Sequence, residues 1–291
     1  MRMAVAHVTV CTLALTLPAL AAPSVPDFSG LWWHTSLPGP EPLASGPTSV
    51  TNLSRTREGY SDYGQLVGNY RNPILKPETA ATVKKFGDMS LAGIEFPNPA
   101  NQCWPEPGPF IYKNFGLQVL QHGDVITLLY EQDHEVRHVR MNSSHPAPLS
   151  PSFYGDSVGH YEGDTLVVDT VGIRADRPFA MVDLYGTPYS SALHMVERFR
   201  LIDYEQAKEG LARDAKENYR VAAGTVNRNY RGKYLQVLFT VDDPAVFTTP
   251  WSATVTYGRG STEWPETVCA ENGHVYYDKD ETVPTAIKPD F

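Results

Sequence analysis

The chain has 291 residues, and its 33 acidic residues outnumber its 24 basic ones, which gives a net charge of −9 at pH 7. Such a balance repels phosphate backbones and anionic lipids, and no Lys/Arg-rich run offsets it. Nucleic acid and membrane surfaces are therefore poor candidates as partners. We expect a small, apolar or weakly polar molecule instead.

The first 21 residues have the composition of a cleavable signal peptide. Arg2 precedes an apolar run over 8–20, and Ala19-Leu20-Ala21 has the spacing that signal peptidase recognises. The run is shorter than the roughly 20 residues that cross a bilayer, and no later stretch approaches that length. The sequence therefore predicts an exported chain, 22–291, that is secreted or periplasmic. Without Arg2 this mature chain has 23 basic and 33 acidic residues, a net charge of −10.

Two cysteines remain after removal of this segment, Cys103 and Cys269. In an oxidising compartment two cysteines are the minimum for one bridge. We expect a disulfide that joins an early loop to the C-terminal segment. Two buried free thiols are the alternative.

The region 22–115 is rich in proline, glycine, serine and asparagine, which predicts a loop-rich N-terminal segment. One short helix is expected over 77–86, where Pro77 and Glu78 stand in the first turn and Lys84 and Lys85 near the end. A second helix is expected over 204–219.

From residue 116 onward, apolar β-branched and aromatic runs separated by turn residues predict strands. The expected strands are 125–130, 135–141, 157–161, 165–173, 194–201, 235–241 and 251–257. Gly163-Asp164 forms a tight turn between two of them, which favours antiparallel pairing of sequence neighbours. We predict one all-β domain, 22–291: an antiparallel meander that closes into a barrel or stacks as a sandwich, wrapped by 22–115 and one or two short helices.

The opening Gly30-Leu31-Trp32 is similar to the Gly-x-Trp of lipocalin-like barrels, where it begins the first strand. A wider set of motifs resembles a large, mostly uncharacterised group of exported bacterial proteins. These motifs are Pro26 to Trp32, Cys103 to Pro109, Gly155 to Thr170, His194 to Phe199, Asp243-Pro244 and Pro250-Trp251. Tyr161 replaces the tryptophan usual in the central motif. The resemblance implies a lipocalin-like barrel with a shared pocket, and it implies no reaction.

The segment 134–138 matches the His-Glu-x-x-His pattern of zinc peptidases. That motif requires a helix, because only there do positions four apart share a face and reach one metal. Here the segment follows an expected strand and a short turn, so we predict a second strand. His134 and His138 would then lie about 13 Å apart, and we expect no metal site.

Two carboxylates stand on apolar strand faces. Asp169 alternates with Val167 and Val171, and Glu197 alternates with Met195 and Phe199. A buried carboxylate must be paired or become neutral, and a neutral one can serve as a general acid or base. Candidate partners are Arg198, Arg200, Arg140, His138, His145 and His194. A structural ion-pair network that ties the strands together is the alternative.

Gly155-Asp156-Ser157-Val158-Gly159 has the spacing of a serine-hydrolase elbow, but a strand and not a helix follows it. Asp156 and Ser157 are instead expected at a pocket mouth. We expect substrate contacts from these two residues and from His138, Arg140, Tyr154 and Tyr189, the tyrosines standing among many loop aromatics suited to stacking on a ligand. No nucleotide fingerprint or metal-spaced cluster is found, which favours cofactor-free chemistry.

These residues support two hypotheses. The first is a cofactor-independent lyase or isomerase, such as a dehydratase or cyclase, acting on an apolar or aromatic molecule within a β-barrel. Its catalytic residues would be Glu197, Asp169, His194, His145 and Arg198. The second is an exported carrier that uses the same pocket without catalysis.

Overall fold

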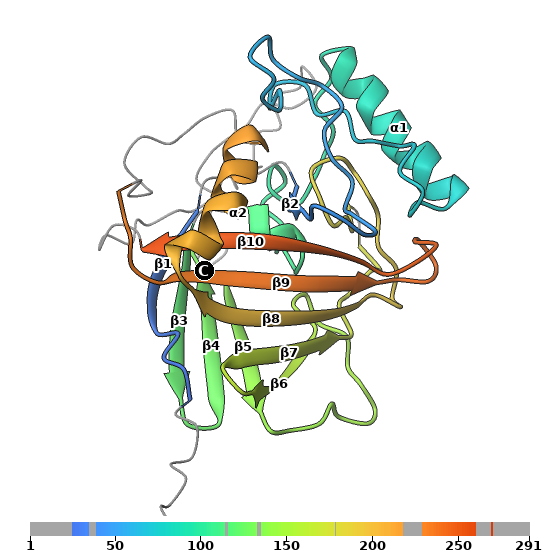
Figure 1. Cartoon of the computed structure of the whole chain (residues 1–291). Coiled ribbons are helices and arrows are strands. Elements are labelled where there is room, and N and C mark those ends of the chain that lie inside the picture. Colours follow the sequence, from blue (N-terminus) through green and yellow to red (C-terminus); the bar gives the residue numbers. More distant parts are fainter. Residues whose placement is uncertain are drawn as a thin grey trace, which may run out of the picture.

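The computed structural model describes residues 25–34, 39–113, 116–132, 135–177, 179–217, 229–259 and 269. The predicted signal peptide lies outside these residues. The described part is mainly β-structure, 36% strand and 15% helix, and its strands form a closed, mixed, nine-stranded barrel of lipocalin-like form (Figure 1). The predicted fold class is confirmed.

The barrel strands follow one another in chain order. They are β1 (Gly30–Trp33), β3 (Gly116–His122), β4 (Val125–Tyr130), β5 (Val136–Met141), β6 (Asp156–Glu162), β7 (Thr165–Val171), β8 (His194–Ile202), β9 (Tyr234–Asp242) and β10 (Trp251–Arg259). Trp32 closes the ring, because it pairs with Leu117 of β3 and with Arg259 of β10. A two-residue strand, β2 (Glu41–Pro42), pairs with Ala253 and Thr254 in the N-terminal half of β10.

One pairing departs from the predicted meander. β5 and β6 run parallel, with Val139 opposite Ser157, whereas the other neighbouring barrel strands are antiparallel. The segment between them, 142–155, is too long for a hairpin turn. It returns the chain toward the end at which β5 begins, so that Ser157 of β6 lies beside Val139 of β5. The sequence contains no two-residue turn signal here, and a longer connection permits parallel pairing.

Alternation along the strands places the core inside the barrel. On β9 the side chains of Leu235, Val237, Phe239 and Val241 are fully buried, and the residues between them lie on the outer face. Trp32 is also fully buried; its indole nitrogen donates to the Phe28 carbonyl at 2.8 Å, and the Arg259 guanidinium lies 3.7 Å from its ring centroid. Gly30 has φ +115°, a backbone conformation that residues with a Cβ rarely adopt, which favours glycine at this position.

The N-terminal segment packs against one end of the barrel and carries the first helix, α1 (Pro77–Leu91), which is one turn longer than predicted (Figure 1). Leu75 bridges to Phe247 beyond β9, which attaches this segment to the barrel. A single 3-10 turn, η1 (Phe110–Lys113), precedes β3, and α2 (Tyr204–Glu217) packs on β2, β9 and β10. None of the helices in the described residues is long and apolar enough to cross a bilayer.

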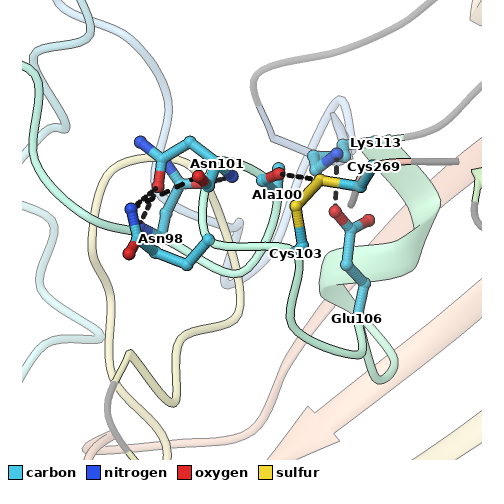
Figure 2. The surroundings of a disulfide bond; sticks show 8 residues. Asn98, Ala100, Asn101, Cys103, Glu106, Lys113 and Cys269 are labelled. Carbon is cyan, nitrogen blue, oxygen red and sulfur yellow. Dashed lines mark hydrogen bonds and ion pairs between the residues drawn. A yellow bond between two sulfur atoms is a disulfide. The ribbon is translucent and has the colours of Figure 1, made fainter. Parts of the chain in front are cut away.

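Cys103 and Cys269 lie at disulfide distance, with their Cα atoms 5.4 Å apart across 166 positions of sequence (Figure 2). The Cys269 sulfur also contacts the carbonyl of Ala100 at 3.5 Å. Beside the bridge, Lys113 forms an ion pair of 3.2 Å with the buried Glu106. The predicted pairing of these two cysteines therefore agrees with the structure.

Candidate functional site

A buried ion pair lies inside the barrel near the end at which β5, β6 and β8 begin and β7 ends; we call this the loop end. Arg137 of β5 and Glu197 of β8 both point inward and form two hydrogen bonds, one of them 2.9 Å from Nη1 to Oε1. The Glu197 side chain is 0% exposed. An isolated charge at such a position would be very costly, and the pairing of two opposite charges offsets this cost.

The remaining donors of Arg137 are also used. Nε donates to the Ser157 hydroxyl at 3.0 Å, and Nη2 donates to Thr170 at 3.2 Å. The hydroxyl of Tyr112, from η1, donates to Glu197. Burial, and then the charge of Glu197, holds the pKa of the Tyr112 phenol well above its usual value, so that it remains a donor. The interior cluster is therefore a satisfied network that joins η1 to β5, β6, β7 and β8.

A second charged cluster lies on the outer face of the same strands. Arg140 binds Asp156 through both nitrogens of its fork, at 2.6 and 3.0 Å. His145 links two carboxylates: its Nδ1 lies 2.6 Å from Asp156, and its Nε2 lies 2.8 Å from Asp169. His194 completes the chain, with Nε2 at 2.8 Å from the other oxygen of Asp169.

The contacts of the outer cluster shift the pKa values of His145, Asp156 and Asp169 toward their charged forms. Partial burial opposes protonation of His145, but the hydrogen bonds and charges of Asp156 and Asp169 outweigh it, so the His145 pKa is raised. The hydrogen bond from Arg140, supported by His145, lowers the pKa of Asp156. Burial would raise the pKa of Asp169, but hydrogen bonds from His194 and His145 lower it overall. Alternating positive and negative groups thus stabilise one another.

The predicted catalytic residues do not form one site. Glu197 lies inside the barrel, whereas Asp169, His194 and His145 lie outside it, and Arg198 pairs with the exposed Glu162 at 2.6 Å. The physical reason is register: Glu197 stands opposite Val168, not Asp169, so that the two carboxylates point to opposite sides of the wall.

The predicted substrate-binding residues divide in the same way. Asp156 and Arg140 belong to the outer cluster, and Ser157 belongs to the interior one. His138 points outward and hydrogen-bonds with Thr127 at 3.1 Å. The Tyr189 hydroxyl donates to the carbonyl of Arg174 at 2.9 Å. Burial, and then the nearby charge of Glu135, raises the pKa of the Tyr154 phenol.

Arg137 and Tyr112 were not among the predicted site residues. The predicted partners of Glu197 were Arg198, Arg200, Arg140 or a histidine, but each of these arginines points outward. Alternation could have identified the partner, because Arg137 shares a strand face with Val139 and Met141, both buried. Tyr112 stands in a loop-rich region, where no periodic pattern indicates direction.

The predicted strand at 134–138 is observed from Val136 onward, and His134 lies outside the described residues. Within the described ranges, no group of three or more His, Cys, Asp or Glu side chains is arranged to hold a metal ion. Comparison with protein-family models, curated proteins and solved structures found no match to this chain.

Proposed function

We propose that the protein is an exported, cofactor-independent enzyme of lyase or isomerase type that moves a proton on a small apolar or aromatic molecule, and that Asp169 and His194 are its reacting pair. The observation that carries this proposal is the 2.8 Å contact between His194 Nε2 and Asp169 Oδ2 on the outer face. A carboxylate bound to one imidazole nitrogen fixes the tautomer and increases the basicity of the other.

Accessibility favours this pair over Glu197. The His194 side chain is 42% exposed, so a substrate could reach its Nδ1, whereas Glu197 is enclosed and paired with Arg137. Asp169 is held on its other oxygen by His145, which keeps the carboxylate oriented toward His194. Two titratable groups therefore converge on one accessible point, as general acid–base catalysis requires.

The surroundings of the pair suit an apolar substrate and proton transfer. Val158 and Val196 flank Asp169 on the neighbouring strands, and both are partly exposed on the outer face. The Ser157 hydroxyl, on the neighbouring strand β6, points into the barrel and accepts a hydrogen bond from Arg137. It therefore cannot act as the nucleophile of a hydrolase at this pair.

The test begins with small molecules retained by the purified protein and identified by mass spectrometry. Each is incubated with the protein in D2O. An enzyme of the proposed type should introduce deuterium or form an isomeric or dehydrated product, and Asp169→Asn and His194→Gln should each lower the rate by about 100-fold or more. Arg198→Gln, on the same outer face but paired with Glu162, is the matched control and should retain the rate.

A specific cavity favours the carrier hypothesis as a second candidate. It has a volume of about 580 Å³ and lies beside α1, between apolar residues such as Leu66, Phe96 and Leu184 and polar ones such as Asn98. Ligand sites of this size and mixed character are common. A retained molecule that is recovered without deuterium, and that binds equally well to Asp169→Asn, would support the carrier and contradict the enzyme.

A further inference from the structure

The cavity beside α1 has an apolar wall that does not belong to the barrel core. Phe96 and Leu184 line it and are 4% and 6% exposed. Both are members of a second hydrophobic cluster, separate from the one inside the barrel. Ile94 also lines the cavity and is 45% exposed. An apolar molecule in the cavity would therefore cover side-chain surface that otherwise faces water, which favours binding.

Asn98 supplies a hydrogen-bond donor to the same cavity. The residue lines the cavity and is 8% exposed. Its Oδ1 accepts from the backbone amide of Asn101 at 3.1 Å, which fixes the orientation of the side-chain amide. Within the described part of the chain, its Nδ2 donates only to the Phe96 carbonyl, at 3.4 Å. Since an amide nitrogen has two N–H groups, one of them is left for an acceptor on a bound molecule.

The charges around the cavity favour a neutral acceptor. Lys113 lines the cavity, but its ammonium is paired at 3.2 Å with the buried Glu106 (Figure 2). Glu95 lines the cavity as well, so one lysine and two glutamates leave an excess of negative charge that repels a carboxylate. An ammonium group is disfavoured for another reason: it has no acceptor for the Asn98 N–H, and water screens its attraction to the exposed Glu95.

The wall that carries Asn98 is ordered by its own contacts. The Asn98 backbone amide donates to Asn101 Oδ1 at 2.8 Å, and the Asn101 amide donates back to Asn98 Oδ1. Cys103 follows at once and is bridged to Cys269, whose sulfur contacts the carbonyl of Ala100 at 3.5 Å (Figure 2). A wall that is already ordered loses little conformational entropy when a ligand binds.

We propose that this cavity binds a neutral, carbonyl-bearing apolar molecule, whose carbonyl oxygen accepts from Asn98 Nδ2 and whose apolar body packs on Phe96 and Leu184. Amides, esters and ketones belong to this class, whereas carboxylates and amines do not. The proposal names the ligand class of the carrier candidate and rests on that part of the proposed function. It does not depend on proton transfer at Asp169 and His194.

The probes are 4-butylbenzamide, 4-butylbenzoate and 4-butylbenzylamine, which share one apolar body and differ in the charge of the head group. Calorimetry measures their binding to the mature, disulfide-bonded protein. The amide should bind about fivefold or more tightly than either charged probe. Asn98→Asp keeps the acceptor for Asn101 and replaces the donor with a carboxylate. It should weaken the amide about 3- to 10-fold and make the amine the tightest of the three probes.

A second pair of variants tests where the probes bind. Ile94→Gln removes an apolar contact from the cavity and should weaken all three probes by a similar factor, about threefold or more. Leu91→Gln is the matched control, because Leu91 is 56% exposed at the end of α1 and does not line the cavity. It should change the affinities by less than about 1.5-fold.

The proposal is wrong if the amide does not bind, if a charged probe binds as tightly, or if Ile94→Gln and Leu91→Gln have equal effects. The comparison of the three probes uses the wild-type protein, so it remains decisive if a variant does not fold. Protein that introduces deuterium into a retained molecule but does not bind the amide would reject the cavity proposal alone. Protein that binds the amide but introduces no deuterium would reject the enzyme alone.

Discussion

Glu197 and Asp169 stand on neighbouring strands, β8 and β7, but on opposite faces of the barrel wall. Glu197 pairs in register with Val168, and Asp169 pairs with Val196. The first carboxylate therefore faces Arg137 in the interior, and the second faces His145 and His194 outside. A substitution of Glu197 should therefore lower the stability of the fold, whereas a substitution of Asp169 should alter the chemistry at the exposed outer face.

Glu197→Gln should destabilise the fold. The change leaves the buried Arg137 charge without its partner, which typically costs roughly 3 to 5 kcal/mol. Glu162→Gln is the matched control, because Glu162 is 49% exposed and pairs with Arg198 at the surface; its cost should stay below about 1 kcal/mol. Urea unfolding of both variants measures the difference. Unchanged stability combined with lost turnover in Glu197→Gln would instead make Glu197 a catalytic acid or base.

The outer cluster should make stability depend on pH in a defined direction. The raised His145 pKa means that its contribution is complete below its ordinary value of 6.5 and is lost as pH rises through the folded-state pKa. The lowered pKa values of Asp156 and Asp169 mean that their contributions are present above their ordinary value of 3.8 and are lost as pH falls. The cluster should therefore stabilise the fold most between these two values.

His145→Gln tests this dependence. The free energy of unfolding of the wild-type protein should fall as pH rises above 6.5, because His145 then loses its proton. This part of the fall should be absent from His145→Gln, and urea unfolding across the pH range measures both profiles. His160→Gln, which removes an exposed histidine paired with Glu162, should leave the wild-type profile unchanged. Identical profiles for wild type and His145→Gln would show that His145 does not carry the effect.

The Cys103–Cys269 bridge should form in the mature protein and stabilise it. Closing a loop of 166 positions restricts the unfolded chain by about 5 kcal/mol in the chain-entropy model. Non-reducing peptide mapping should recover the two cysteines in one linked pair, and Cys269→Ser should lower the melting temperature. Recovery of two free thiols from protein isolated under oxidising conditions would contradict the bridge.

Protein purified without added metal should contain no zinc bound through His138. The side chain of His138 points outward from β5 toward Thr127, and a strand separates residues four apart by about 13 Å. Elemental analysis measures the zinc content. One zinc per chain that disappears in His138→Ala would restore the peptidase hypothesis.

The sequence by itself determined the type and position of most elements. The helices at 77–86 and 204–219 and the strands from residue 125 onward were recognisable, because propensity, capping and hydrophobic alternation are local properties. Alternation also showed that Glu197 lies on an apolar face. The Gly-x-Trp opening coincides with the start of β1, where Trp32 closes the ring.

Only the tertiary structure decided which charged groups meet. The face of each strand follows from its own residues, but the side of the wall on which Asp169 and Glu197 lie depends on how β7 and β8 close into a barrel. The parallel pairing of β5 with β6 depends likewise on contacts between distant segments. Such contacts form between residues far apart in the chain, and local periodicity contains no information about them.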